Sequence, residues 1–454
     1  MKKGMFFALA ASSLLFSACS SDDAVLSTEG QNEAVQQIVL QVASSGDGLT
    51  TRAGRPLYSS QALQTIQNVR VLIYNTATNA IVKDAKLNWT ESNPYNNHGR
   101  QLTLTYKGTD RLDEGSYKVM AVGYSNNSDY IYALNVAGTA DLTGSTYDDI
   151  TATLKANKVA EEVFAGDAAL TIGADKKITN LTPGEEDGVA VTLHRQVAGS
   201  FGYFQNIPAS VNGKTAKTLR LVVRDKNNML TFNNFNSLFT ANGATGSTVK
   251  YYVNGSKSKG TTVTPDAKFD GGENGYVLYS IDLGTWFPGG DKNKDGVLNG
   301  DDTNWTHPTN VRTTVVKGSV FGSSFIIPFA LTHEKSTMEL QLLDTAGDVI
   351  KKWTVSIPKG DVNSVATGGN VADESAFVFN VVRNHMYNLG VKPSNGGTTD
   401  PDPGNPDPDP KPDPDKPDPD KPDPDKPEDL SKSQNLILKV NDNWEAIHKL
   451  ELGE

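Results

Sequence analysis

A proline- and aspartate-rich tract near the C-terminus separates the last strand-forming residues of this chain from everything before them. Residues 400–429 contain eleven Asp, one Glu and four Lys, and the unit Lys-Pro-Asp-Pro-Asp repeats every five residues from 411 to 425. Alternating proline excludes helices and central strands and favours polyproline II. We therefore expect a disordered Pro/Asp-rich linker over 394–429, of which the thirty residues 400–429 could span about 90 Å when fully extended.

The segment after this linker, 430–454, predicts a strand with one buried face. Apolar side chains alternate at Leu436, Leu438 and Val440, which is the period of a half-buried strand. Further apolar residues would continue the contact, namely Trp444, Ile447, Leu450 and Leu452. The linker offers no surface on which this strand can pack, so it must complete a sheet formed elsewhere, in its own chain or in another.

The rest of the chain predicts an all-β protein. Its 454 residues are enough for two domains plus tails, and 41 Gly with 22 Pro favour strands joined by long loops. Strands are spaced regularly without an alternation of strand and helix, and 125–190 is loop-rich with room for short helical pieces. We expect two β-sandwich-like domains, over 53–196 and 197–393, followed by the linker and the C-terminal strand.

The N-terminus has the pattern of an export signal. Lys2 and Lys3 precede a mostly apolar stretch over 5–16, and small residues lead to Cys19, the single cysteine of the chain. This arrangement predicts a signal peptide over 1–18, and it resembles a bacterial lipobox in which Cys19 is lipidated. The alternative is an ordinary signal peptide with an unrelated cysteine. Residues 20–23 resemble the acidic signal that directs Bacteroidales lipoproteins to the cell surface.

The composition excludes several classes of function. Of the net charge of −11, the tract over 400–429 carries −8, and no basic stripe favours nucleic acid. With Cys19 at the signal, the exported body contains no disulfide and no thiolate site. The six histidines lack metal-ligand spacing, and no nucleophile elbow or phosphate loop is present. We therefore expect a protein that is not an enzyme.

One loop, 291–302, has the spacing of a calcium site. Oxygen-bearing side chains stand at positions 1, 3, 5, 9 and 12, glycine stands at position 6, and a backbone carbonyl would serve at position 7. The loop resembles the dockerin form of an EF-hand, although position 12 is Asp, no second copy exists and 286–290 predicts a turn where a helix would precede. The alternative is a polar loop without metal. The expected calcium ligands are Asp291, Asn293, Asp295, Val297, Asn299 and Asp302.

A short strand at 36–43 is joined to the first domain by a loop that contains Arg52 and Arg55. Glycine, serine and proline make this loop a natural site for proteolysis. The alternative is an ordinary first strand followed by a turn.

The order of these features resembles the fimbrillins of the Bacteroidales, the type V pilins, and is closest to the shaft subunit of their short (minor) fimbriae. The resemblance covers essentially the whole chain. It rests on Arg195 within 193–198, on 382–384 with Tyr387, and on the linker followed by the tail with Trp444. It implies two transthyretin-like domains.

The resemblance also implies how the chain is used. A fimbrillin is exported as a lipoprotein, palmitoylated at the residue matching Cys19 and carried to the outer membrane. By this resemblance an arginine-specific protease would then cut between Arg52 and Ala53, which makes residues 19–52 a propeptide that contains the N-terminal strand. Loss of the first strand opens a groove that the C-terminal strand of a neighbouring copy fills. Its partners would be further copies head to tail, tip and anchor subunits, and the fimbria would support adhesion, biofilm and virulence.

Two other readings stay open on the sequence alone. One is a tip or accessory fimbrial adhesin, and the other is a surface lipoprotein that binds glycans. Either Arg52 or Arg55 could be the residue after which the chain is cut.

Overall fold

The computed structural model of this chain describes most of both predicted domains and part of the C-terminal tail. The described residues are 35–42, 66–89, 93–95, 99–183, 188–224, 226–232, 264–269, 272–309, 315–328, 338–356, 386–390, 427–432, 436–437 and 439–441. Nearly all regular structure in them is strand, so the prediction of an all-β chain is confirmed. None of the helices in these ranges has the length and hydropathy needed to cross a membrane.

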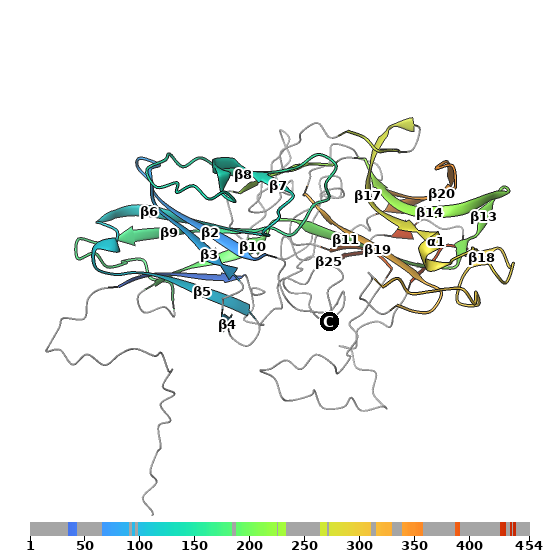
Figure 1. Ribbon diagram of the computed structural model, residues 1–454, viewed down its shortest axis with the longest axis horizontal. Helices are drawn as coiled ribbons and strands as arrows, with labels where there is room; N and C mark the ends of the chain where they lie inside the picture. The colour runs from blue at the N-terminus through green and yellow to red at the C-terminus, as the bar shows by residue number, and fades with distance from the viewer. Residues whose placement is uncertain are drawn as a thin grey trace, which may run out of the picture. The chain divides into compact units, whose positions relative to one another are not determined.

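An eight-stranded sheet forms the body of the first domain (Figure 1). In spatial order its strands are β3 (Ile81–Asn88), β2 (Asn68–Asn75), β6 (Gly115–Tyr124), β9 (Phe164–Ile172), β10 (Gly188–Arg195), β1 (Gln36–Val42), β5 (Gly99–Tyr106) and β4 (Asn93–Tyr95). The link between β9 and β10 is short, with His194 opposite Ala165 and Arg195 opposite Phe164. Both halves of the sheet bury side chains in one apolar cluster, so the sheet folds over at this link into a sandwich.

Alternation along β2 places its side chains in two different cores. Val69 and Val71 join the cluster shared with β1 and β10, whereas Leu72 and Tyr74 join a second cluster on the other face. β6 alternates in the same way. The half of the sheet that contains β2 and β6 is therefore a middle layer that is buried on both sides, as the strand period of two requires.

A three-stranded sheet covers the outer face of this middle layer. Its order is β15 (Met229–Phe232), β8 (Ile150–Leu154) and β7 (Tyr130–Tyr132). The loop-rich region expected over 125–190 therefore contributes strands as well as the short 3₁₀ helix η3 (Ala133–Asn135); a further 3₁₀ turn, η2 (Gly108–Asp110), follows β5. β15 falls within the range predicted for the second domain, yet it pairs with β8 of the first.

Two sheets enclose the core of the second domain. One contains β19 (Val320–Ile326), β11 (Ala198–Gln205), β22 (Met386–Leu389) and β25 (Lys439–Asn441), with β23 (Glu428–Asp429) beside β11. The other contains β16 (Ala267–Lys268), β17 (Asn274–Asp282), β14 (Lys214–Val223), β20 (Met338–Asp344), β21 (Val349–Ser356) and β24 (Leu436–Ile437), with β13 (Ser210–Val211) beside β14.

The predicted calcium loop is joined to the second domain by strand pairing and by a buried side chain. A single α-helical turn, α1 (Leu283–Trp286), begins at an Asp282 side-chain cap and is followed by a turn in which Gly290 N–H donates to the Phe287 carbonyl at 2.9 Å. β18 (Val297–Leu298) then pairs with β12 (Ile207–Pro208), and Leu298 is buried in the core. The helical turn is shorter than the first helix of an EF-hand, in keeping with the turn predicted before the loop.

Candidate functional site

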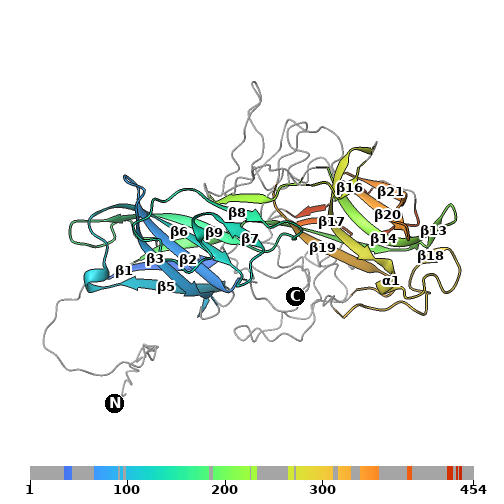
Figure 2. The same ribbon diagram turned by 45° about the horizontal axis from the view of Figure 1, so that its top comes forward.

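β1 occupies a position inside the first sheet, between two strands that are distant from it in sequence. It runs parallel to β10, from Gln37 opposite Gly188 to Val42 opposite Leu193. It runs antiparallel to β5, from Gln36 opposite Tyr106 to Gln41 opposite Gln101, and Figure 2 shows the two strands side by side. A central strand is thus supplied by residues that precede the whole of the first domain in sequence.

The side chains of β1 are part of the sandwich core. Ile38 and Leu40 are buried in the cluster that also contains Val191 of β10, while Val39 is buried on the opposite face. Burying a branched aliphatic side chain contributes about 1.5–3 kcal/mol relative to leaving it exposed. β1 is therefore a major stabilising element of this domain.

Gln36, the first residue of β1, is also buried, with 1% of its surface exposed. Its Oε1 accepts a hydrogen bond from the Leu112 N–H at 2.8 Å, and its Nε2 donates to the Leu112 carbonyl at 3.0 Å and to the Lys176 carbonyl at 2.9 Å. The side chain thus pairs three backbone groups from two loops. A buried backbone group without a hydrogen-bond partner lowers stability, so position 36 requires a side chain that can both donate and accept hydrogen bonds as this amide does.

Three of the predicted processing residues, Cys19, Arg52 and Ala53, lie outside the described residues. Their order in the chain is still informative, because Arg52 and Arg55 fall between β1, which ends at Val42, and β2, which begins at Asn68. A cut at either arginine would separate β1 covalently from every other strand.

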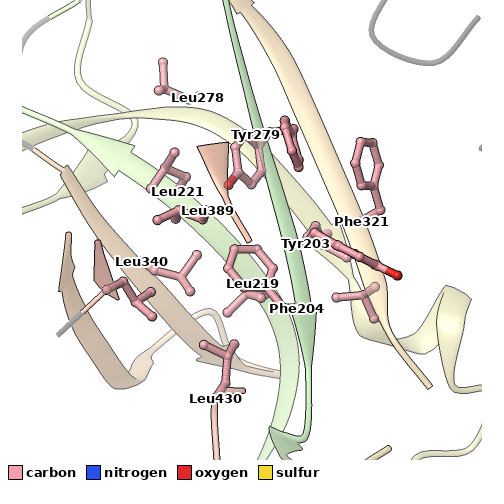
Figure 3. Packing of buried hydrophobic residues seen from close by; sticks show 14 of the residues in the cluster. Tyr203, Phe204, Leu219, Leu221, Leu278, Tyr279, Phe321, Leu340, Leu389 and Leu430 are labelled. Carbon is pink, nitrogen blue, oxygen red and sulfur yellow. The ribbon is translucent and has the colours of Figure 1, made fainter. Parts of the chain in front are cut away.

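The C-terminal tail is paired with the second domain of its own chain as far as the structure describes it. β23 lies parallel to the end of β11, and the Leu430 N–H donates to the Gln205 carbonyl at 3.0 Å. The Leu430 side chain is fully buried, and Figure 3 shows it in one cluster with Leu219 and Leu340. The last two residues of the range predicted as linker, 428 and 429, are therefore strand, because the prolines have ended and an apolar residue follows.

The two predicted donor residues that the structure describes lie in different sheets. Leu436 is 1% exposed and lies opposite Val355 in the parallel pair of β24 with β21. Val440 lies opposite Tyr387 in the antiparallel pair of β25 with β22. The other predicted donor residues fall outside the described residues: Leu438, Trp444, Ile447, Leu450 and Leu452.

The loop over 291–302 is held by its own carboxylates. Asp302 is fully buried, and its carboxylate accepts from the backbone N–H groups of Lys292 at 2.7 Å, Asn293 at 3.3 Å and Asn299 at 3.0 Å. Asp291 accepts from Gly296 N–H at 2.8 Å, where the backbone has a φ of +88°. Glycine adopts such a positive φ readily, and this permits the sharp turn at position 6 of the loop.

The carboxylates of this loop accept hydrogen bonds that calcium would have to replace. Asp295 accepts from Val297 N–H at 2.9 Å and from the Asn299 side-chain amide at 2.8 Å, and these bonds lower the pKa of its carboxyl. The oxygen types fit a hard cation. Nevertheless, no three acidic, histidine or cysteine side chains converge on one point within the described residues. Calcium binding would therefore require these carboxylates to turn from backbone donors towards an ion.

Two features that the resemblance emphasised have structural roles. Arg195 and Glu162 form an ion pair at 2.8 Å with both side chains fully buried, close to the link between β9 and β10. Tyr387, in β22, is fully buried in the core of the second domain. Residues 382–384 lie outside the described residues.

The chain matches no protein-family model and no curated protein. Similar solved structures include the tip fimbrial protein Mfa3 from Porphyromonas gingivalis with C-terminal truncation (11% identity, TM-score 0.35, covering 78% of this chain and 94% of that chain). They also include the fimbrial anchor protein Mfa2 from the same organism (10%, 0.31, 79% and 90%). A fimbrial assembly protein from Parabacteroides distasonis is a third (12%, 0.31, 79% and 90%). These values describe a distant likeness.

Gln36 and Leu430 were not among the predicted site residues. Gln36 is polar, as is usual at a strand end that faces solvent. The sequence feature that marks it as buried is its spacing of two residues from Ile38 and four from Leu40, which places it on the apolar face of the strand. Leu430 is a lone apolar residue after a polar tract, so no periodicity marks it.

Proposed function

We propose that this protein is a structural shaft subunit of a cell-surface fimbria, matured by cleavage after Arg52 and polymerised by strand exchange. The observation that carries the proposal is the place of β1, a core strand that is joined to its domain only through the arginine-bearing loop. Cleavage of that loop, followed by loss of β1, would convert a complete sandwich into one that needs a strand from another molecule.

Removal of β1 would create a groove with two unpaired edges. β10 and β5 would each present a row of backbone N–H and C=O groups, and the floor between them would be apolar. Such an edge binds an extended strand through main-chain hydrogen bonds, and alternate side chains provide specificity. A strand of suitable pattern follows the linker in the same chain.

Exchange between copies then produces a fibre. The groove belongs to the first domain and the donor tail follows the second, so the contact is head to tail and does not close on itself. In the single chain the described residues between Leu436 and Asn441 form two short ladders with the second domain of the same chain, β24 with β21 and β25 with β22. Those ladders must open before the tail can reach another copy.

Lipidation and cleavage would determine where the fimbria assembles. We propose that Cys19 is lipidated at the outer membrane, that the precursor is held there until an arginine-specific protease acts, and that tip and anchor subunits complete the fimbria. In adhesion and biofilm the shaft would serve as a scaffold. We further propose that calcium, if bound by the loop over 291–302, stiffens the second domain and takes no part in catalysis.

The decisive experiment changes the two arginines together, because Arg55 can replace Arg52 as the cleavage site. The Arg52→Ala/Arg55→Ala chain is expected to stay monomeric with its N-terminal segment retained, as seen by N-terminal sequencing and by negative-stain microscopy of the cell surface. The two single variants serve as controls and show which arginine is cut. Fimbriae of normal length built from the double variant would contradict the proposal.

Immunogold labelling separates the shaft from the alternative role of a tip or accessory subunit. A shaft subunit is labelled along the whole fibre. Label confined to fibre ends would assign this chain to the tip, where an acceptor groove is needed but a donor strand is not.

A further inference from the structure

The tail carries a second version of the β1 sequence. β1 reads Gln36-Gln-Ile-Val-Leu-Gln-Val42, and the tail reads Gln434-Asn-Leu-Ile-Leu-Lys-Val440. Gln, Leu and Val are identical at the first, fifth and seventh positions, and the third and fourth positions exchange Ile for Leu and Val for Ile. We infer that residues 434–440 of a neighbouring copy enter the β1 position in this register and in the same direction, with Gln434 in the place of Gln36; the inference rests on the proposed function.

The match follows the buried positions of the groove. Ile38 and Leu40 fill the first-domain core, and the register places Leu436 and Leu438 there. Val39 is buried on the other face, and the register places Ile437 there. Every buried aliphatic position of β1 thus receives an aliphatic side chain of the same or nearly the same size, which a closely packed core tolerates well.

Gln36 distinguishes this register from its neighbours. A slip of one residue would turn Leu436 and Leu438 away from the core. A slip of two residues in one direction would place Leu436 where Gln36 lies, and the Leu112 N–H with the Leu112 and Lys176 carbonyls would lose their partner. A slip of two in the other direction would push the Gln434 amide into the apolar position of Ile38.

Gln434 is thus a register-determining residue of the donor strand. It is the residue of the tail that can restore all three hydrogen bonds made by Gln36 while Leu436 and Leu438 stay in the core. Alternating apolar residues alone leave slips of two possible, and this amide removes that ambiguity because buried backbone groups must be paired.

The groove also offers more pairing than the tail has in its own chain. β1 forms a six-residue ladder with β10 and another with β5. Among the described residues of the tail, β24 pairs over two residues and β25 over three, each on one side of the strand. Transfer of the same segment to a vacated β1 position therefore adds backbone hydrogen bonds on both sides of it.

Cysteine cross-linking between copies tests the register directly. Gln41 lies opposite Gln101, so the register places Lys439 of the donor opposite Gln101 of the acceptor. A two-residue slip would instead place it opposite Thr103 or Gly99. Lys439→Cys is combined in turn with Gln101→Cys, Thr103→Cys and Gly99→Cys, since Cα atoms more than about 7 Å apart do not form a disulfide. The readout is a ladder of multimers on a non-reducing gel after mild oxidation of fimbriae.

The expected result is a strong ladder for the Gln101 pair and weak ones for the other two. A dominant ladder with Thr103→Cys or Gly99→Cys would overturn the register while leaving the proposed function intact. Fimbriae that form no ladder with any of the three pairs would overturn it as well. A wild-type chain that forms no fimbriae would instead refute the proposed function. Lys439→Cys alone is the control for assembly.

A second experiment measures the contribution of the Gln434 side-chain amide by itself. Gln434→Leu is expected to reduce the fraction of denaturant-stable multimers about tenfold or more, because it leaves three backbone groups unpaired. Asn435→Leu, its neighbour at the half-buried position of Gln37, is the matched control and should assemble normally. Normal assembly of Gln434→Leu, with thermal unfolding of both variants like that of the wild-type monomer, would overturn the role given to this residue.

Discussion

Gln36 and Leu112 are joined by reciprocal hydrogen bonds, with Leu112 N–H donating to Gln36 Oε1 at 2.8 Å and Gln36 Nε2 donating to the Leu112 carbonyl at 3.0 Å. The pair connects the first strand of the chain to the loop before β6. It shows that β1 is fitted to its position by a specific polar contact as well as by apolar burial. Any segment that takes its place meets the same three backbone groups.

The first prediction concerns this pair in the uncut precursor. Gln36→Leu is expected to lower the free energy of unfolding by about 1–3 kcal/mol, because the backbone partners of the amide become unpaired in a buried site. The measurement is urea unfolding in the Arg52→Ala/Arg55→Ala background, with Gln37→Leu as the matched half-buried control. Equal midpoints for both variants would argue against the role of Gln36. In chains from which the proposed cleavage has removed β1, the substitution should have no effect.

The second prediction concerns Leu430. Leu430→Ala is expected to destabilise the second domain by about 2–5 kcal/mol, because the side chain is fully buried in a packed core. Its exposed neighbour supplies the control, and Lys432→Ala should change stability by less than about 1 kcal/mol despite its ion pair with Asp429. Differential scanning calorimetry of the monomer measures both. A small effect of Leu430→Ala would mean that the chain after the linker is not part of this domain.

Local patterns predicted the elements of this fold better than their partners. The regularly spaced strands expected from the sequence are present, among them β2, β6 and β20. Alternation specifies a strand and its buried face, which are properties of neighbouring residues. The place of β1 between β10 and β5 depends instead on contacts such as Gln37 with Gly188, which no local pattern encodes.

The tail shows the same limit. Its alternating residues indicated a strand that would complete a sheet, and Leu436 is indeed buried in one. The sheet that the tail extends belongs to the same chain. An exposed sheet edge can pair with any strand of suitable pattern, so alternation in the tail does not specify which edge it joins. Likewise, residues 229–232 lie in the range predicted for the second domain, yet as β15 they pair with β8, since loop composition gives no information about which edge a short strand will reach.

The third prediction concerns the loop over 291–302 without metal. Asp302→Asn is expected to lower stability by about 1–3 kcal/mol, because an amide replaces one of two acceptor oxygens that bind three backbone N–H groups in a buried site. Asp301→Asn, exposed in the same loop, is the matched control. Thermal unfolding in the presence of a chelator measures both. If the two variants unfold at the same temperature, Asp302 does not hold the loop.

The fourth prediction tests calcium at this loop. If the ion binds the folded chain alone, calcium at 100 times its dissociation constant should add about 2.7 kcal/mol to the stability of the wild-type chain. Asp291→Asn/Asp295→Asn should remove that increment, because it removes two carboxylates of a site that favours charged oxygens. Unfolding curves with calcium and with a chelator give the comparison. Identical wild-type curves would mean that the loop is a polar loop without metal.

The last prediction is a loss of stability in alkali that originates in the first domain. Burial raises the pKa of Tyr132 and of Tyr147, both of which belong to the cluster between β6 and the outer sheet, and burial raises the pKa of Tyr106 to about 12. A tyrosine in the unfolded chain ionises near pH 10. The stabilisation by these neutral side chains is therefore complete below about pH 10 and falls as pH rises from there, through about pH 12 for Tyr106. Each such tyrosine contributes a slope of about 1.4 kcal/mol per pH unit in that range.

The substitution Tyr132→Phe tests this prediction. It should reduce the slope of stability against pH by the contribution of one tyrosine, about 1.4 kcal/mol per pH unit. At pH 8 it loses only the contact of the hydroxyl with Ser128 Oγ at 3.2 Å. Urea unfolding between pH 8 and pH 11.5 measures both quantities, and an unchanged slope in Tyr132→Phe would show that this hydroxyl ionises as readily in the folded chain as in the unfolded one.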